Sequence, residues 1–273
     1  MNRVCKRLGI DHICHARGIA GRGIRIAVLD SGVTAHPFLS GCLTEFEDFT
    51  KREKVQGLYD DNGHGCHVCG ILHRIAPASE ILMGKVLMQD GTGDLEHAIR
   101  GMEWILERHE KEPIHILNLS LGLNATLTQA KQKRLNEMMQ KINDEGIAII
   151  CAAGNHCKEN DRKHIRDTAG SALLVGCIAS GPCYPDVVAP GEGIVSCDTG
   201  RGYIAKSGSS MATPVVSGIL ALALEGKKRI LPYDIYQSIK RSSKDLGHSR
   251  RKQGYGMVNP EGLLLQLEML ENK

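Results

Sequence analysis

The sequence has 273 residues, of which 42% are hydrophobic and only 4% aromatic, so the core must be built from aliphatic and small side chains. It carries 34 basic and 31 acidic residues, a formal charge of +3, and this balance gives no reason to expect a nucleic-acid or membrane partner. No apolar run approaches the ~20 residues that span a bilayer, and the N-terminal residues lack the apolar core of a signal peptide. The predicted location is therefore the cytoplasm.

Five short apolar runs predict buried strands. The first, 24–30, is rich in β-branched residues and ends in Asp30, and the others cover 80–87, 114–122, 146–155 and 171–179. Helical patterns follow at 97–110 and 128–146, the second with a glycine where a C-cap belongs. This alternation predicts an α/β fold of one domain, 1–273, with a mostly parallel sheet covered by helices on both faces. Ligands bind such sheets at the carboxyl ends of the strands.

Three residues of catalytic type follow one another at such places. Asp30 ends the first strand, His64 is framed by glycines at the start of a predicted helix, and Ser210 opens an apolar helical run. A serine hydroxyl attacks only when a base takes its proton, and an imidazole does this best beside a buried carboxylate. Asp, His, Ser is one of the recognised chain orders of such triads. Gly208 would permit a sharp turn before the helix, and Pro214 is expected in its first turn.

The surrounding motifs make the chain resemble the subtilisin-like serine proteases, or subtilases. They are VLDSGV, NGHGCHVCG, LNLSLG, AAGN, VAPG, GSSMATP and GYGMVNP, in that order along nearly the whole chain. The resemblance implies that Ser210 is the nucleophile, His64 the general base and Asp30 its orienting partner. It also implies that Asn155 donates to the oxyanion beside the Ser210 N–H.

The resemblance further implies that an extended peptide or protein substrate binds as an added strand. The clamping and pocket residues would be Gly91, Thr92, Gly93, Leu95, Ala98, Ser120, Leu121, Gly122, Ala152, Ala153 and Gly154. Of these, Leu95 and Ala98 would border an upstream pocket and 152–154 would form one wall of the primary pocket. Nearby carboxylates at 60, 61, 94 and 96 would favour basic substrate side chains, unless they are helix caps or solvated turn residues.

Four departures from the family shape the hypothesis, and one of them is that Cys66 and Cys69 stand where the family generally has small residues. The chain begins near the usual mature N-terminus, so we expect no pro-domain of family size. The segment 71–80 offers few oxygen ligands where the family often binds calcium, so no metal or cofactor is expected. The segment 179–188 is short and 156–170 is unusually charged, which leaves the base of the primary pocket open.

Ten cysteines are expected to stay reduced, most of them as small buried residues. Cys66 and Cys69 form a C-x-x-C beside His64 and His67, which would suit a metal or redox protein, but side chains at these helical spacings mostly diverge. The leading hypothesis is a monomeric, intracellular, calcium-independent endopeptidase with a dedicated maturation role. The alternatives are a catalytically silent binding module of the same fold and a Cys/His metal or redox protein.

Overall fold

The computed structural model describes residues 2–51, 56–121, 127–155, 157, 171–181 and 183–271. The strands are β1 (Arg25–Asp30), β2 (Leu43–Asp48), β3 (Glu80–Lys85), β4 (Ile116–Leu119), β5 (Ala148–Ala152), β6 (Leu173–Gly176), β7 (Val187–Val188), β8 (Ile194–Cys197) and β9 (Tyr203–Lys206). The α-helices are α1 (Asn2–Leu8), α2 (Ile10–Arg17), α3 (His64–Ile75), α4 (Leu95–His109), α5 (Gln129–Asp144), α7 (Ser209–Leu224), α8 (Pro232–Ser242), α9 (Arg250–Gln253) and α10 (Pro260–Glu271). Two short 3₁₀ turns, η1 (Pro37–Leu39) and η2 (Ile178–Ser180), complete the described elements.

The central sheet is parallel, with strand order β2-β3-β1-β4-β5-β6-β7. All five predicted strands belong to it, and β1 lies between β3 and β4. Residues of β1 alternate between two cores, because successive side chains of a strand point to opposite faces: Ile26 and Val28 join one core, Ala27 and Leu29 the other. Asp30 therefore stands at the carboxyl end of an inner strand.

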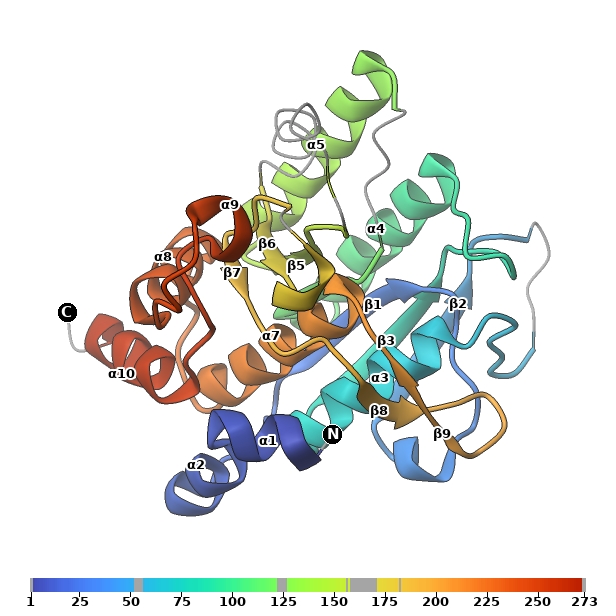
Figure 1. Cartoon of the computed structure of the whole chain (residues 1–273). Coiled ribbons are helices and arrows are strands. Elements are labelled where there is room, and N and C mark those ends of the chain that lie inside the picture. The colour runs from blue at the N-terminus through green and yellow to red at the C-terminus, as the bar shows by residue number, and fades with distance from the viewer. Residues whose placement is uncertain are drawn as a thin grey trace.

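Helices cover both faces of the sheet (Figure 1). On one face, α3 and α7 pack against each other and against the sheet, with α8 and α10 outside them. On the other face lie α4 and α5, whose apolar side chains share a core with Leu29. The predicted single-domain α/β architecture is confirmed.

Several elements were not predicted. The edge strand β2 carries three acidic residues, β7 has only two residues, and β8 and β9 form a separate antiparallel hairpin. Short or charged strands of this kind lack the apolar run on which the prediction depended. The hairpin matters for the site, because β9 leads directly into the turn before α7.

The prediction that the cysteines stay reduced is wrong for one pair. Cys157 and Cys183 form a disulfide across 26 residues of sequence. The other eight cysteines are free, and all but Cys14 are buried, as expected of small apolar side chains.

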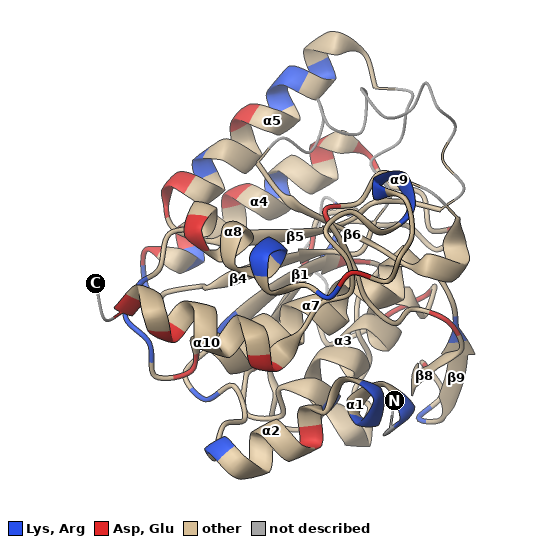
Figure 2. Ribbon diagram, turned by 60° about the vertical axis from the view of Figure 1, so that its left-hand side comes forward, with Lys and Arg blue, Asp and Glu red and all other residues tan. Residues whose placement is uncertain are grey.

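Within the described residues, no helix is both long and apolar enough to cross a membrane. Acidic and basic side chains are interspersed, as Figure 2 shows along α5.

Candidate active site

Asp30 and His64 form a hydrogen-bonded pair at the carboxyl end of β1. His64 is the first residue of α3, and its Nδ1 lies 2.7 Å from Oδ1 of Asp30. The same carboxylate oxygen accepts the Ser31 N–H at 2.7 Å, and Asp30 is fully buried while 22% of the His64 side chain remains exposed. Burial lowers the pKa of His64, but the Asp30 carboxylate outweighs it and leaves the pKa above its ordinary value. The geometry suits an imidazole that takes up a proton at Nε2.

Asp60 fixes the start of α3. Its Oδ1 accepts the Ser31 hydroxyl at 2.9 Å and the Gly63 N–H at 2.8 Å, and its Oδ2 accepts the Cys66 N–H at 2.9 Å. Asp60 thus satisfies N–H groups that a helix start leaves without partners, and it ties them to the residue after Asp30. The carboxylate is committed to the fold, so it does not serve as a substrate-binding charge.

Lys85 is a structural feature that the sequence analysis missed. Its side chain is 1% exposed, and its ammonium donates to the Ser31 carbonyl, the Leu87 carbonyl and Asp61 Oδ1, each at 2.7 Å. The sequence did contain a sign of this role, namely a lysine inside the apolar run 80–87. A lysine in a buried strand needs partners for its charge, because lysine is almost never fully buried unless it is paired. Lys85 joins the end of β1 to the loop before His64 and to the wall of the cleft.

Ser210 is the second residue of α7, directly after a sharp turn. Gly208 has φ 145° and ψ 172°, a conformation that disfavours any residue with a side chain. Pro214 lies inside the helix rather than in its first turn, so that prediction is wrong. The proline lacks the N–H that would bond the Ser210 carbonyl, and burial of the surrounding helix face holds the helix together instead.

Asn155 lies beside this turn. Its Oδ1 accepts the Ser209 N–H at 3.0 Å, and a Cβ on Gly208 would come within 3.3 Å of its Nδ2. Because Oδ1 is committed as an acceptor, the two Nδ2 protons are left as donors next to Ser210.

A cleft of about 820 Å³ brings His64 and Ser210 together with most of the predicted substrate residues. Those that line it are Gly91, Thr92, Gly93, Leu95, Ala98, Ser120 and Leu121, whereas Gly122 lies outside the described residues. Most of the remaining lining is apolar, from Val86, Leu87, Met88, Met102, Leu119, Leu127 and Leu135, and Asn62, Asp90, Asp94 and Lys131 add polar groups. The cleft is therefore suited to an apolar side chain.

The first predicted clamp is a tight turn. Leu87 and Gly93 form an antiparallel bridge, the Met88 N–H donates to the Thr92 carbonyl at 2.8 Å, and Gly91 has φ 78°. At the second clamp, buried Asn118 donates to the Ser120 hydroxyl at 2.9 Å and accepts the Ser217 hydroxyl at 2.8 Å. This network connects the clamp at the end of β4 to the helix that carries Ser210.

The structure does not bring the predicted primary-pocket wall into the described cleft. Ala152 and Ala153 are only 3% and 2% exposed, and Gly154 also lies outside the lining. The remaining acidic candidates have structural partners: Asp61 pairs with Lys85, Asp94 caps α4, and Glu96 pairs with Arg134. The hypothesis of a basic substrate side chain gains no support from these carboxylates.

The C-x-x-C segment also serves the fold. Cys66 lies against Thr34, whose N–H is 3.1 Å from the sulfur, and burial raises the pKa of Cys66 to about 12. His67 bonds the carbonyls of Ile194 and Ile204 through Nε2. The residues described contain no group of three or more potential metal ligands, and this segment lies within the core.

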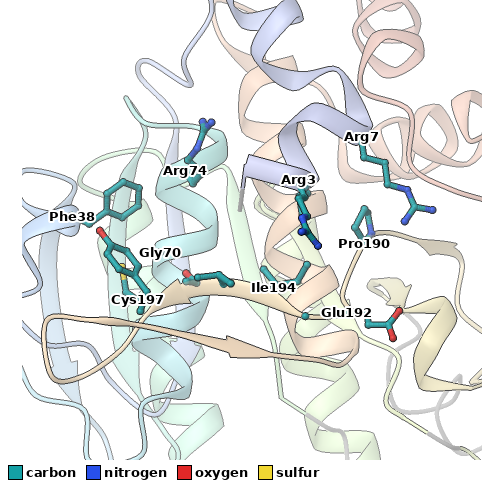
Figure 3. Close-up of a pocket in the computed structure, with 14 residues that line it drawn as sticks. Arg3, Arg7, Phe38, Gly70, Arg74, Pro190, Glu192, Ile194 and Cys197 are labelled. Atoms are coloured by element: carbon teal, nitrogen blue, oxygen red, sulfur yellow. The ribbon is translucent and has the colours of Figure 1, made fainter.

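A second cavity, of about 1100 Å³, lies elsewhere, between α1 and the β8–β9 hairpin (Figure 3). Arg3 on α1 points toward Ile194 in β8, and Arg7 lies near Pro190, with Glu192 at the same end of the cavity. None of the predicted site residues lines it, so its size does not make it the active site.

The chain is similar to known proteins along most of its length. Residues 21–257 match the model of the Subtilase family. The chain is 32% identical over 261 residues to Thermostable alkaline protease of Halalkalibacterium halodurans, covering 90% of this chain and 68% of that protein. It is 32% identical over 268 residues to Subtilisin BL of Lederbergia lenta (90% and 93%) and 29% identical over 295 residues to Serine protease AprX of Bacillus subtilis (89% and 66%).

Proposed function

Because the chain belongs to the subtilase family, and so to the serine endopeptidases, we propose that it cleaves peptide bonds through a triad of Ser210, His64 and Asp30. The observation that supports the triad best is the 2.7 Å contact between His64 Nδ1 and buried Asp30, with Ser210 lining the same cleft as His64. Asp30 fixes the imidazole tautomer that leaves Nε2 free to act as a base.

In this mechanism the Ser210 hydroxyl attacks the substrate carbonyl while His64 takes its proton. The tetrahedral oxyanion receives hydrogen bonds from Asn155 Nδ2 and from the Ser210 N–H. The two donors meet at the start of α7, where the helix dipole favours negative charge. His64 then protonates the leaving amine, and water hydrolyses the acyl-enzyme by the same steps in reverse order.

The substrate is proposed to bind as an extended strand between the turn 91–93 and the segment 120–122. The aliphatic lining around Leu95, Ala98 and Met102 favours an apolar substrate side chain upstream of the cut bond. The alternative of a basic side chain has less support, because Asp61 and Glu96 are ion-paired and Asp94 caps α4.

The direct test compares the purified chain with Ser210→Ala on a diverse peptide library, read by mass spectrometry, with EDTA present. We expect the parent alone to cleave the peptides. The cut bonds should have an apolar residue on their upstream side. A folded parent that cleaves nothing would favour the alternative, a silent binding module of the same fold. Activity that disappears only with EDTA would contradict calcium independence.

A cytoplasmic, monomeric enzyme dedicated to one maturation substrate is the narrower proposal. It depends on the hazard of an unrestrained protease inside a cell. The disulfide counts against a reducing compartment, since such bonds persist mainly in oxidising ones. Cell fractionation with an antibody and light scattering of the purified chain test location and oligomeric state.

A further inference from the structure

The Cys157–Cys183 disulfide lies next to the proposed oxyanion donor. Cys157 follows Asn155 by two residues, and Cys183 lies in the connection between η2 and β7. The two Cα atoms are 4.9 Å apart, and the Cys157 N–H also donates to the Cys183 sulfur at 3.0 Å. The bond therefore joins Cys157, just after β5, to Cys183, in the connection that leads to β7.

Within the described residues, the backbone around Asn155 is anchored on both sides, and this bond is one of the anchors. On the strand side, the Ala153 N–H donates to the Val175 carbonyl at 2.8 Å, and β5 ends there. On the far side, the disulfide holds Cys157, whose sulfur lies close to Gly154. Asn155 sits between these anchors and reaches α7 through its own side chain. Opening the disulfide would remove the anchor at Cys157 and leave Asn155 held by the end of β5 and by its own bond to the Ser209 N–H.

Among the described cysteines, this pair is the one suited to exchange with a soluble thiol. Cys157 is half-buried whereas Cys183 is buried, so Cys157 is the side of the bond that is open to attack. The other eight cysteines are free thiols, which a reductant leaves unchanged. A redox change at moderate reductant concentration would thus be confined to the bond beside Asn155.

We propose that the Cys157–Cys183 disulfide is a redox switch for the peptidase, acted on by dithiol reductants; the proposal rests on the proposed function. A thiolate of the reductant attacks the Cys157 sulfur and Cys183 leaves as a thiolate. The second thiol of the reductant then resolves the mixed disulfide. The chain gains two electrons and two protons and ends with two thiols, while the reductant becomes a disulfide. The reduced enzyme, with its oxyanion donor loosely held, is the less active form.

The test measures kcat and KM of the full chain after equilibration in mixtures of reduced and oxidised dithiothreitol. Alkylation and mass spectrometry report the state of Cys157 and Cys183 in each mixture. We expect kcat to fall at least about tenfold on reduction and to recover on reoxidation, because a fully lost oxyanion donor costs about 10²–10³-fold, a range measured on the asparagine of subtilisin. Full reduction with kcat unchanged within twofold overturns the proposal, as does a purified chain that never forms the bond.

Two variants complete the design. Cys157→Ser with Cys183→Ser should have the low kcat of the reduced parent and no response to dithiothreitol, whereas Cys14→Ser, at a half-buried free cysteine, should keep the full response. A response that persists in the double variant overturns the proposal. If the double variant does not fold, the alkylation series on the parent decides alone. An oxidised parent that neither cleaves peptides nor reacts with a fluorophosphonate contradicts the proposed function instead.

Discussion

Replacing Asp30 by asparagine should remove most of the catalytic rate while leaving the fold intact. Asn and Asp have the same shape, and Asp30 is fully buried, so the change removes a charge and alters a hydrogen bond without opening a cavity. At 2.7 Å and an effective dielectric constant of about 20, the attraction between the carboxylate and a protonated His64 is about 6 kcal/mol.

That energy corresponds to about four powers of ten in rate, since each 1.36 kcal/mol is about tenfold. This loss of rate agrees with the roughly 10⁴-fold fall in kcat known for the same change in serine-protease triads. In those triads the amide also favours the wrong tautomer of the histidine. We therefore expect kcat to fall about 10⁴-fold, with little change in KM because Asp30 does not line the cleft.

The pH profile gives a second readout. His64 must be neutral to act as a base, so kcat/KM falls as the pH drops through its pKa. Because Asp30 raises that pKa, Asp30→Asn should move the acid limb to lower pH. Peptide hydrolysis between pH 5 and 10, with circular dichroism to verify folding, provides both measurements. A folded variant that keeps kcat within tenfold of the parent would refute this reasoning.

Three further changes follow from the same contacts. Lys206→Met removes a cation that lowers the pKa of His64, so the acid limb of kcat/KM should move to higher pH, and a shift in the other direction contradicts the assignment. Lys85→Met leaves two carbonyls and a carboxylate without their donor and should lower the free energy of unfolding in urea by about 3–5 kcal/mol; an unchanged midpoint would count against it. Burial lowers the pKa of His67 to about 4 from 6.5, so the unfolded chain binds more protons between these values. The contribution of His67 to the free energy of unfolding should be complete above pH 6.5 and should fall by about 3 kcal/mol toward pH 4. In His67→Gln the free energy of unfolding should lack this part of the pH dependence.

The sequence predicted the structure well where a pattern of side chains is compatible with a single type of secondary structure. The β-branched run ending in Asp30 could hardly be anything but a buried strand, and the glycines around His64 and Ser210 correctly indicated turns entering helices. The resemblance then supplied what pattern alone could not, namely that these separate strand ends meet.

The sequence was less informative where partners decide a residue's role. Asp60 and Asp94 look alike in sequence, but one is buried and accepts four hydrogen bonds while the other caps an exposed helix start. Cys157 and Cys183 are 26 residues apart, and no spacing rule distinguishes this pair from the other cysteines. Such assignments depend on tertiary contacts that are not encoded in local periodicity.

The most direct measurement is to map the site of reaction with a fluorophosphonate, which phosphonylates only an activated serine. Intact mass and peptide mapping should show one adduct, on Ser210, that is lost in Ser210→Ala and also in His64→Ala, where the nucleophile remains but its base does not. A folded parent that gains no adduct, or gains one on another residue, would contradict the triad of Ser210, His64 and Asp30.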